Sequence, residues 1–189
     1  MIGALAVSGT ILKRGADIEA ARRAAEAILE KLGPVRTLSH FAKGRAARGS
    51  ASLVDYAYLA EGLLDLHENT GELRWRSEAA GLADAAVARF WDPAGSFFSA
   101  DAKHGPLPLR AKTAHDTEHP SANGVMAGVL LRLGRLTGEA RYTRLGEKTI
   151  EAFAPEAASD PQGMETLMAA ALLLDSPAIG RSSPLPPSP

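Results

Sequence analysis

The 189-residue sequence contains no cysteine, which excludes disulfides, a thiol nucleophile and metal sites built on thiolates. It also lacks an excess of either charge, since 21 basic and 22 acidic residues leave a formal net charge of -1. Without a broad positive field, the chain is not expected to bind nucleic acid or an anionic membrane. Aromatic residues make up only 5% of the sequence, so the position of each one helps to locate the hydrophobic core or a binding site.

The chain opens with an apolar stretch from Met1 to Leu12 that has the hydrophobicity of a secretory signal. No charged residue precedes the stretch, and Lys13 and Arg14 follow it, which is the reverse of the order in a signal peptide. We therefore interpret the stretch as a helix. No later apolar run approaches the roughly 20 residues needed to cross a bilayer. A soluble, cytoplasmic protein is expected.

Hydrophobic residues make up 46% of the chain, enough for one ordinary core. Apolar positions recur at helical spacing, which predicts three helical hairpins and a closing helix in an all-α domain over residues 1–175. Asp160 and Pro161 are predicted as the N-cap and first residue of the closing helix. The proline-rich segment 176–189 is predicted to be a disordered tail. The predicted helices cover residues 2–12, 18–32, 52–67, 75–90, 121–136, 142–153 and 161–174.

A short internal repeat supports this arrangement. The stretch from Thr70 to Trp75 reads TGELRW, and the stretch from Thr137 to Tyr142 reads TGEARY, each after a leucine-rich helix. Both mark the turn of a helical hairpin. Ser52 and Asp55 have the spacing of a capping box at the start of the helix before the first of these turns. Repeated hairpins stack because no single hairpin can bury its apolar face alone.

Two connections between the predicted helices are long. Residues 91–120 contain several prolines and glycines, so they cannot form one regular helix, and Phe97 with Phe98 is predicted to begin a short strand. The segment from Lys43 to Gly49 is basic and contains glycine, and we interpret it as part of a loop. Connections as long as 91–120 are uncommon unless they line or cover a site. That segment is the first place to look for function.

The stretch from Asp55 to Leu64, DYAYLAEGLL, resembles a stretch in the spermatogenesis-associated protein 20 family, also described as thioredoxin-domain-containing proteins of the YyaL type. The order and spacing of the matches hold from about Met1 to Asp175. Several matches in order are more specific than one short motif. The further matches are Arg89 to Asp92, Gly95 to Phe98, Arg110 to Lys112, Asp116, and Pro120 to Gly124.

This resemblance implies an (α/α)6 toroid related to six-hairpin glycosidases and to N-acylglucosamine 2-epimerases, preceded in full-length members by a thioredoxin-like domain. Three hairpins and a closing helix correspond to about half of such a toroid, which a partner or a second copy would complete. Without cysteine, the chain cannot supply the redox chemistry of a thioredoxin-like domain. Thr113 stands where an acidic residue is expected and Ala122 where glycine is expected, which weakens any transfer of activity.

The segment from Arg110 to Asn123 concentrates ionisable and amide side chains just before a predicted helix. In a toroid such loops lie at one mouth of the central cavity, where Asp116 would serve as a general base or acid. In the alternative interpretation Ser121 is an N-cap, and Asp116 is a loop acceptor or a partner of Arg110. The substrate-binding residues predicted in this segment are Arg110, Lys112, His119, Ser121 and Asn123.

Asp55 and Tyr56 open the third predicted helix, and the family resemblance implies that they face the cavity. A glycosidase needs two carboxyl groups about 5 to 10 Å apart, and Asp55 with Asp116 is the predicted catalytic pair, with Tyr56 contacting the substrate. Glu61 lies six residues after Asp55, a spacing that should place the two on different faces of the helix. In the alternative interpretation Asp55 belongs to the helix cap and Tyr56 to the core.

Three further features have both functional and structural interpretations. Trp91 is predicted to offer its ring to a sugar, although an aromatic residue at a helix end more often belongs to the core. His115 and His119 have metal-ligand spacing, but Pro120 disfavours helical geometry there. His67 is interpreted as a satisfied core histidine. No metal or other cofactor is expected.

Two functions therefore remain open. In the first, the chain is part of a carbohydrate-active-like toroid that binds or processes a sugar in its cavity. In the second, it is a non-catalytic helical scaffold that associates with a protein or with itself, because a half toroid leaves an apolar flank uncovered. The sequence does not decide whether the chain is an enzyme.

Overall fold

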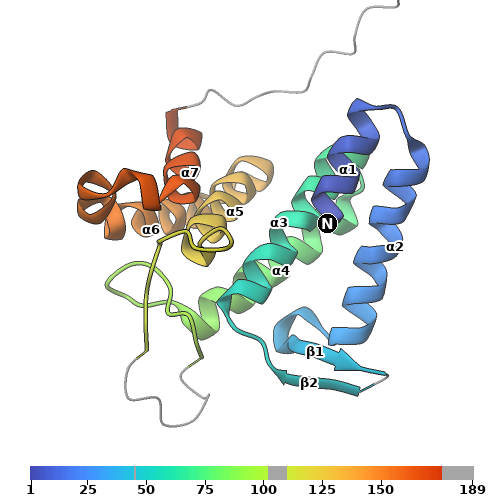
Figure 1. Ribbon diagram of the computed structural model, residues 1–189, viewed down its shortest axis with the longest axis horizontal. Helices are drawn as coiled ribbons and strands as arrows, with labels where there is room; N and C mark the ends of the chain where they lie inside the picture. Colours follow the sequence, from blue (N-terminus) through green and yellow to red (C-terminus); the bar gives the residue numbers. More distant parts are fainter. Residues whose placement is uncertain (45, 102–109, 176–189) are drawn as a thin grey trace, which may run out of the picture.

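The computed structural model describes residues 1–44, 46–101 and 110–175, and these residues form an all-α fold with one small β-hairpin (Figure 1). The seven helices predicted from the sequence are all present in this described part. The elements are α1 (Ile2–Ile11), α2 (Gly15–Leu32), the 3-10 helix η1 (Val35–Thr37), β1 (Ser39–Lys43), β2 (Ala46–Ser50), α3 (Leu53–Thr70), α4 (Leu73–Phe90), α5 (Ala122–Thr137), α6 (Ala140–Ser159), the 3-10 helix η2 (Pro161–Gly163) and α7 (Glu165–Asp175).

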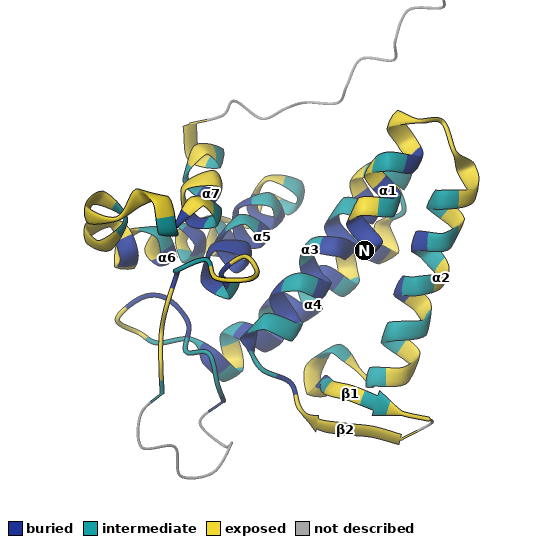
Figure 2. Cartoon of the chain, in the orientation of Figure 1, coloured by how far each residue is buried: buried dark blue, intermediate teal, exposed yellow. Residues whose placement is uncertain are grey.

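The helices form an inner and an outer row. In the inner row α1 packs on α3, α3 on α5, and α5 on α7. The outer helices α2, α4 and α6 each pack on the inner helix of their own hairpin. The middle inner helices therefore have neighbours on several sides, and Figure 2 shows α3 and α5 mostly buried or half-buried.

The start of α3 is fixed by the capping box expected from the sequence. The backbone amide of Ser52 donates to Oδ2 of Asp55 at 2.8 Å, and the reciprocal bond from the backbone to the Ser52 side chain is also present. A capping box satisfies two of the amide groups that a helix N-terminus leaves without partners. The predicted cap interpretation of Asp55 is confirmed.

The turns between α3 and α4 and between α5 and α6 are built alike, as the sequence repeat predicts. The hydroxyl of Thr70 donates to the Leu66 carbonyl at 2.7 Å and accepts from the Glu72 amide at 3.3 Å, while Gly71 takes the left-handed conformation with φ of 73°. In the second turn Thr137 and Gly138 repeat these features, with φ of 75° at the glycine. A positive φ at this position is typical of the residue that ends a helix, and glycine adopts it without strain.

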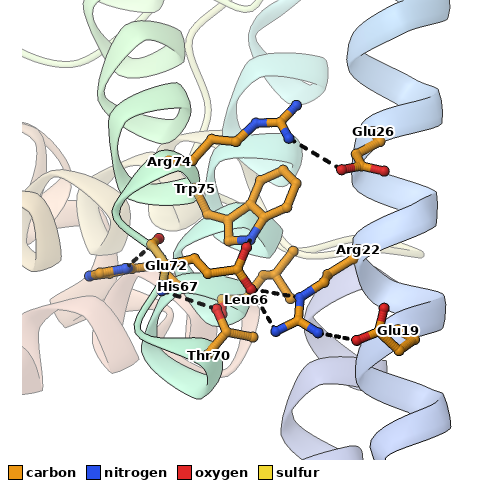
Figure 3. A network of polar contacts seen from close by, with 9 residues as sticks. All are labelled: Glu19, Arg22, Glu26, Leu66, His67, Thr70, Glu72, Arg74 and Trp75. Carbon is orange, nitrogen blue, oxygen red and sulfur yellow. Dashed lines mark hydrogen bonds and ion pairs between the residues drawn. The ribbon is translucent and has the colours of Figure 1, made fainter.

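The first turn is tied to the neighbouring outer helix (Figure 3). The side chain of Glu72 accepts from Arg22 on α2 at 2.6 Å and from the indole nitrogen of Trp75 at 3.0 Å. His67 is buried, and its Nδ1 donates to the Glu72 carbonyl at 2.9 Å, which agrees with its interpretation as a satisfied core histidine. A buried indole or imidazole N–H needs such a partner.

Three local predictions were wrong. The loop predicted around residues 43–49 contains the antiparallel hairpin of β1 and β2, with Ser39 opposite Ser50. It escaped prediction because every residue of β2 is exposed, so the strand carries no apolar alternation. The strand expected at Phe97 is only a single bridge to Trp91. Asp160 precedes η2 rather than the closing helix, and its side chain caps neither.

The predicted disordered tail, 176–189, lies outside the described residues. Within the described part, no helix is long and apolar enough to span a membrane.

The contact between α5 and α7 gives a test of this packing. A Cβ atom added to Gly124 would lie 2.8 Å from the backbone nitrogen of Leu167, whereas one added to Gly15 would meet nothing within 4 Å. We expect Gly124→Ala to lower the free energy of unfolding by about 1–3 kcal/mol, because the backbone of α7 must move. Gly15→Ala should be neutral or stabilising by up to about 1 kcal/mol. Urea denaturation of both variants measures this, and equal stability of the two would contradict the close packing.

Candidate functional site

The candidate site is a cavity of about 560 Å³ on the side of α3 where α1 and α2 approach it. Its wall is mostly apolar, with three carboxylates, one tyrosine and one histidine among the lining residues. A largely apolar cavity with a few convergent polar groups is the usual form of a small-molecule site. The lining residues are Met1, Ile2, Gly3, Ala4, Ile28, Leu32, Leu38, Val54, Asp55, Tyr58, Leu59, Glu61, Gly62, Asp65 and His119.

One face of α3 supplies the polar part of this wall. Tyr58, Glu61 and Asp65 are spaced by three and four residues, so they lie one above another along the helix. Burial raises the pKa of Glu61, and the charge of Asp65 raises it further, against the opposing charge of Arg132. Glu61 is thus a carboxyl group held in surroundings that favour its neutral form.

Asp65 is fixed by the helices on both sides of α3. Its Oδ1 accepts from Nη2 of Arg132 on α5 at 2.7 Å, and Arg132 also contacts Glu68. On the other side, a Cβ atom at Gly3 of α1 would lie 2.0 Å from Oδ2 of Asp65. The absence of a side chain at Gly3 is what allows the carboxylate to lie between α1 and α3.

Asp55 stands at another edge of the cavity. Besides capping α3, its Oδ2 lies 2.9 Å from Nδ1 of His40 on β1, and its side chain is only 18% exposed. Asp55 and Glu61 both line this cavity, although their spacing of six residues predicts that they lie on different faces of α3. The cavity wraps around the first turns of α3, so residues on two faces of the helix reach it.

The end of the long connection reaches the cavity where His119 contacts Tyr58. Their rings meet edge to face, with centroids 6.2 Å apart. The hydroxyl of Tyr58 donates to the Pro120 carbonyl. Burial raises the pKa of Tyr58, as do the charges of Glu61 and Asp116. His119 is therefore the residue of the predicted loop site that lies at this cavity.

Asp116 has a structural position. Its Oδ1 accepts from the Ser121 amide at 2.6 Å, and its Oδ2 accepts from the Thr166 amide at 2.8 Å, so one carboxylate joins the beginnings of α5 and α7. Burial alone would raise the pKa of Asp116, but these amide hydrogen bonds outweigh it and the pKa is lowered. This geometry matches the alternative interpretation of Asp116 as a loop acceptor and gives no support to a general base.

Ser121 and Asn123 also act within the fold. The hydroxyl of Ser121 accepts from the Gly124 amide at 3.1 Å, as an N-cap does. The buried side chain of Asn123 accepts from the Phe97 amide at 2.9 Å and donates to the Phe97 and Thr113 carbonyls. Neither side chain lines the cavity of α1, α2 and α3.

The remaining predicted contacts stabilise the long connection. Arg110 donates to the Ala100 carbonyl and lies 4.0 Å from the ring centroid of Phe98. Lys112 pairs with Asp92 at 2.7 Å. Trp91 stacks edge to face on buried Phe97, with centroids 4.9 Å apart, in the core position of its alternative interpretation.

Tyr56 was predicted to contact substrate, but its side chain is completely buried. Its hydroxyl accepts from Nη1 of Arg89 at 2.6 Å and from the Leu38 amide at 3.1 Å. The alternative interpretation of Tyr56 as core is confirmed. The predicted pair of Asp55 and Asp116 is likewise unsupported, because both carboxylates satisfy backbone amides at helix N-termini.

No group of three or more His, Asp and Glu side chains in the described part of the chain is arranged to hold a metal ion. His115, one of the two histidines with metal-ligand spacing, contacts Glu156 and Asp160 at 3.3 Å. Its partner in that pattern, His119, lies at the α3 cavity instead.

Comparison with known proteins supports the family resemblance. No family model matches the chain. Over 88 residues the chain is 47% identical to spermatogenesis-associated protein 20 of Mus musculus and of Rattus norvegicus, and 46% identical to that of Homo sapiens. Each match covers 46% of this chain and 11% of the relative's length. The predicted resemblance to this family is confirmed over that segment.

The structure also resembles the GH76 α-mannanase of Bacteroides thetaiotaomicron, with a TM-score of 0.66 and 13% sequence identity. The likeness covers 90% of this chain and 48% of the mannanase chain. At this identity the likeness shows the fold alone. The described residues form about half of an α/α toroid of stacked helical hairpins, as the sequence predicted.

Replacement of Asp116 tests its structural role. An asparagine cannot accept from both amides without placing an N–H opposite another N–H, so we expect Asp116→Asn to lower the free energy of unfolding at pH 7 by about 1.5–3 kcal/mol. The folded-state pKa is below the unfolded value of about 3.9, so the stabilisation is complete above that value and is lost as pH falls through the folded pKa. The difference between variant and wild type should therefore shrink in acid.

The control is Glu118→Gln in the same loop, whose exposed carboxylate should leave stability close to that of wild type. Urea denaturation across the acid range measures both variants. If Asp116→Asn is as stable as Glu118→Gln at pH 7, Asp116 does not join the two helices.

Proposed function

We propose that the cavity of α1, α2 and α3 binds a sugar. Three observations support this: the cavity volume of about 560 Å³, the carboxylates of Asp55, Glu61 and Asp65 in its wall, and the half toroid that carries it. Small-molecule sites commonly have volumes of about 300–1,000 Å³, which includes room for one or two sugar rings. The observation that carries the proposal is the polar stripe of Tyr58, Glu61 and Asp65 on an inner helix whose other faces are largely buried.

The chemistry of the wall fits a neutral, hydroxylated ligand. Carboxylates accept hydrogen bonds from hydroxyl groups, and a bond to a charged acceptor is stronger than a neutral one. The rings of Tyr58 and His119 offer apolar surface to the C–H face of a pyranose. The apolar side chains around them would exclude water from those hydrogen bonds.

Binding rather than hydrolysis is the activity that this geometry supports. Glycoside hydrolysis requires one protonated and one ionised carboxyl group, both free to reach the sugar. The pKa of Glu61 is raised, which is the direction that a proton donor requires. Asp55 is committed to the α3 cap and to His40, and Asp65 to Arg132, so no second carboxylate in this wall is free of other partners.

The proposal predicts the effect of removing the Glu61 carboxyl group. In wild type we expect saturable binding of a member of a monosaccharide panel that includes mannose, measured by titration calorimetry. Glu61→Ala should weaken that binding about tenfold, which corresponds to the loss of one hydrogen bond worth about 1.4 kcal/mol. The variant should remain folded, because Glu61 sits where its charged form is disfavoured.

The matched control is Glu151→Ala on α6, an exposed carboxylate distant from the cavity lining, which should bind as wild type does. Circular dichroism confirms that both variants are folded. Absence of saturable binding by wild type to every sugar in the panel would overturn the proposal, as would equal affinities of the two variants.

A second candidate function is self-association through the ends of the inner row. Most of the exposed large apolar side chains in the described part belong to α1 with its C-cap or to α7, the two helices that end this row. An apolar patch on a helix that has no neighbour on that side would suit an interaction surface. The residues are Met1, Val7, Ile11 and Leu12 at α1, and Met168, Leu172 and Leu174 on α7.

Light scattering tests the second candidate. Ile11 is 72% exposed and Leu172 is 69% exposed, so replacing both with lysine should leave the fold intact and convert a dimer to a monomer, because each charge would have to be desolvated in the interface. Leu73→Lys on the outer helix α4, where the leucine is 63% exposed, is the control and should leave the mass unchanged. A wild-type monomer at high concentration would rule out self-association.

A further inference from the structure

A second cavity of about 560 Å³ lies where η1 and the β1–β2 hairpin meet the last turn of α4. It shares Leu38 with the sugar cavity but is lined by different polar groups. Among the described residues, no aromatic side chain lines it. Its polar lining consists of Arg36, Thr37, Ser39, Ser50, Arg89 and Asp101.

Arg89 is held rigidly in this wall. Its Nε donates to Oδ2 of Asp101 at 2.8 Å, its Nη1 to the hydroxyl of Tyr56 at 2.6 Å, and its Nη2 to Oγ of Ser50 at 2.9 Å. A guanidinium group carries five N–H donors, so these three bonds leave one N–H on each terminal nitrogen. The group is oriented in advance, and little side-chain entropy is lost when those two donors bind a ligand.

Arg36 supplies the second positive charge. It is exposed, and among the described residues its side chain makes no hydrogen bond or ion pair. It also lines the adjoining cavity of about 220 Å³ together with Arg89 and Asp84, so the two arginines border the same space, and Asp84 is paired with Arg141. Asp101 is the carboxylate in the wall of the larger cavity, and it is paired with Arg89. Two arginines and one aspartate leave this wall with one net positive charge.

Hydroxyl donors complete the wall. Ser39 and Ser50 lie opposite each other in the register of the β-hairpin, and Thr37 precedes them at the end of η1. A tetrahedral oxyanion accepts several hydrogen bonds from different directions. The paired N–H donors of a guanidinium group, together with hydroxyl groups, can supply them. A neutral sugar would find neither an aromatic face nor an unpaired carboxylate here.

We propose that the cavity between η1, the β-hairpin and α4 binds the phosphate group of a small molecule through Arg36, Arg89 and the hydroxyls of Thr37, Ser39 and Ser50. This site is independent of the proposed sugar cavity, and either can fail without the other. Phosphate fits better than carboxylate, because it offers more acceptor oxygens to donors that surround it on several sides.

Inorganic phosphate is the probe for the test, and the measurement is a series of 1H–15N correlation NMR spectra of the full chain. Titration should give saturable shifts at Ser39, Ser50 and the side-chain N–H groups of Arg36 and Arg89. Arg36→Gln, which removes the charge of an exposed side chain and leaves the Arg89 contacts in place, should weaken binding at least tenfold. Arg144→Gln on α6, another exposed arginine, should bind phosphate as wild type does.

Three results would overturn the proposal. One is the absence of saturable shifts in wild type. Another is equal weakening in Arg36→Gln and Arg144→Gln, which would mean that phosphate only screens surface charge. The third is acetate binding as tightly as phosphate at the same ionic strength, because the cavity would then recognise a carboxylate and not a tetrahedral oxyanion.

Discussion

The turn that joins the two helices of a hairpin is the constraint on which the rest of the structure depends. In each of the two repeated turns a threonine hydroxyl bridges the end of one helix and the amide before the next, and a left-handed glycine reverses the chain. Each turn then anchors an aromatic residue: Trp75 through Glu72 to α2, and Tyr142 through its bond to Asp84 on α4. These anchors tie the second hairpin to α2 and the third to α4, so each of the two hairpins is fixed to the outer helix that precedes it.

The inner row in turn explains where a ligand can be accommodated. Because α3 has neighbours on several sides, a polar side chain on it needs a partner or a cavity. Arg132 of α5 partners Asp65 and Glu68 on one side, and Gly3 of α1 leaves room for the Asp65 carboxylate on the other. Glu61 lines the cavity, and burial raises its pKa. The polar stripe is therefore tolerated in a largely buried helix because the cavity is there.

The fold could be predicted from the sequence much better than the site. Helical periodicity and the repeated turn determine the hairpins, since both are local signals that the chain carries residue by residue. The β1–β2 hairpin gave no such signal, because β2 buries no side chain. The cavity depends on which helix faces which, and Tyr58, Glu61 and Asp65 line it only because α1 and α2 lie beside them. Their spacing along one face of an otherwise apolar helix was the available signal.

The polar side chains of the long connection and the start of α5 have structural roles for a physical reason. A connection without regular structure must satisfy its backbone and the adjoining helix ends with side chains, so acidic, amide and hydroxyl groups collect there whether or not a ligand binds. Asp116, Ser121 and Asn123 all satisfy backbone groups in this way. A buried helix already satisfies its own backbone, so a carboxylate such as Glu61 on it has no comparable structural duty. Inner helices carry polar side chains with structural roles too, since Asn123 lies on α5 and Asp65 pairs with Arg132. It is the cavity beside Glu61 that makes this residue the candidate.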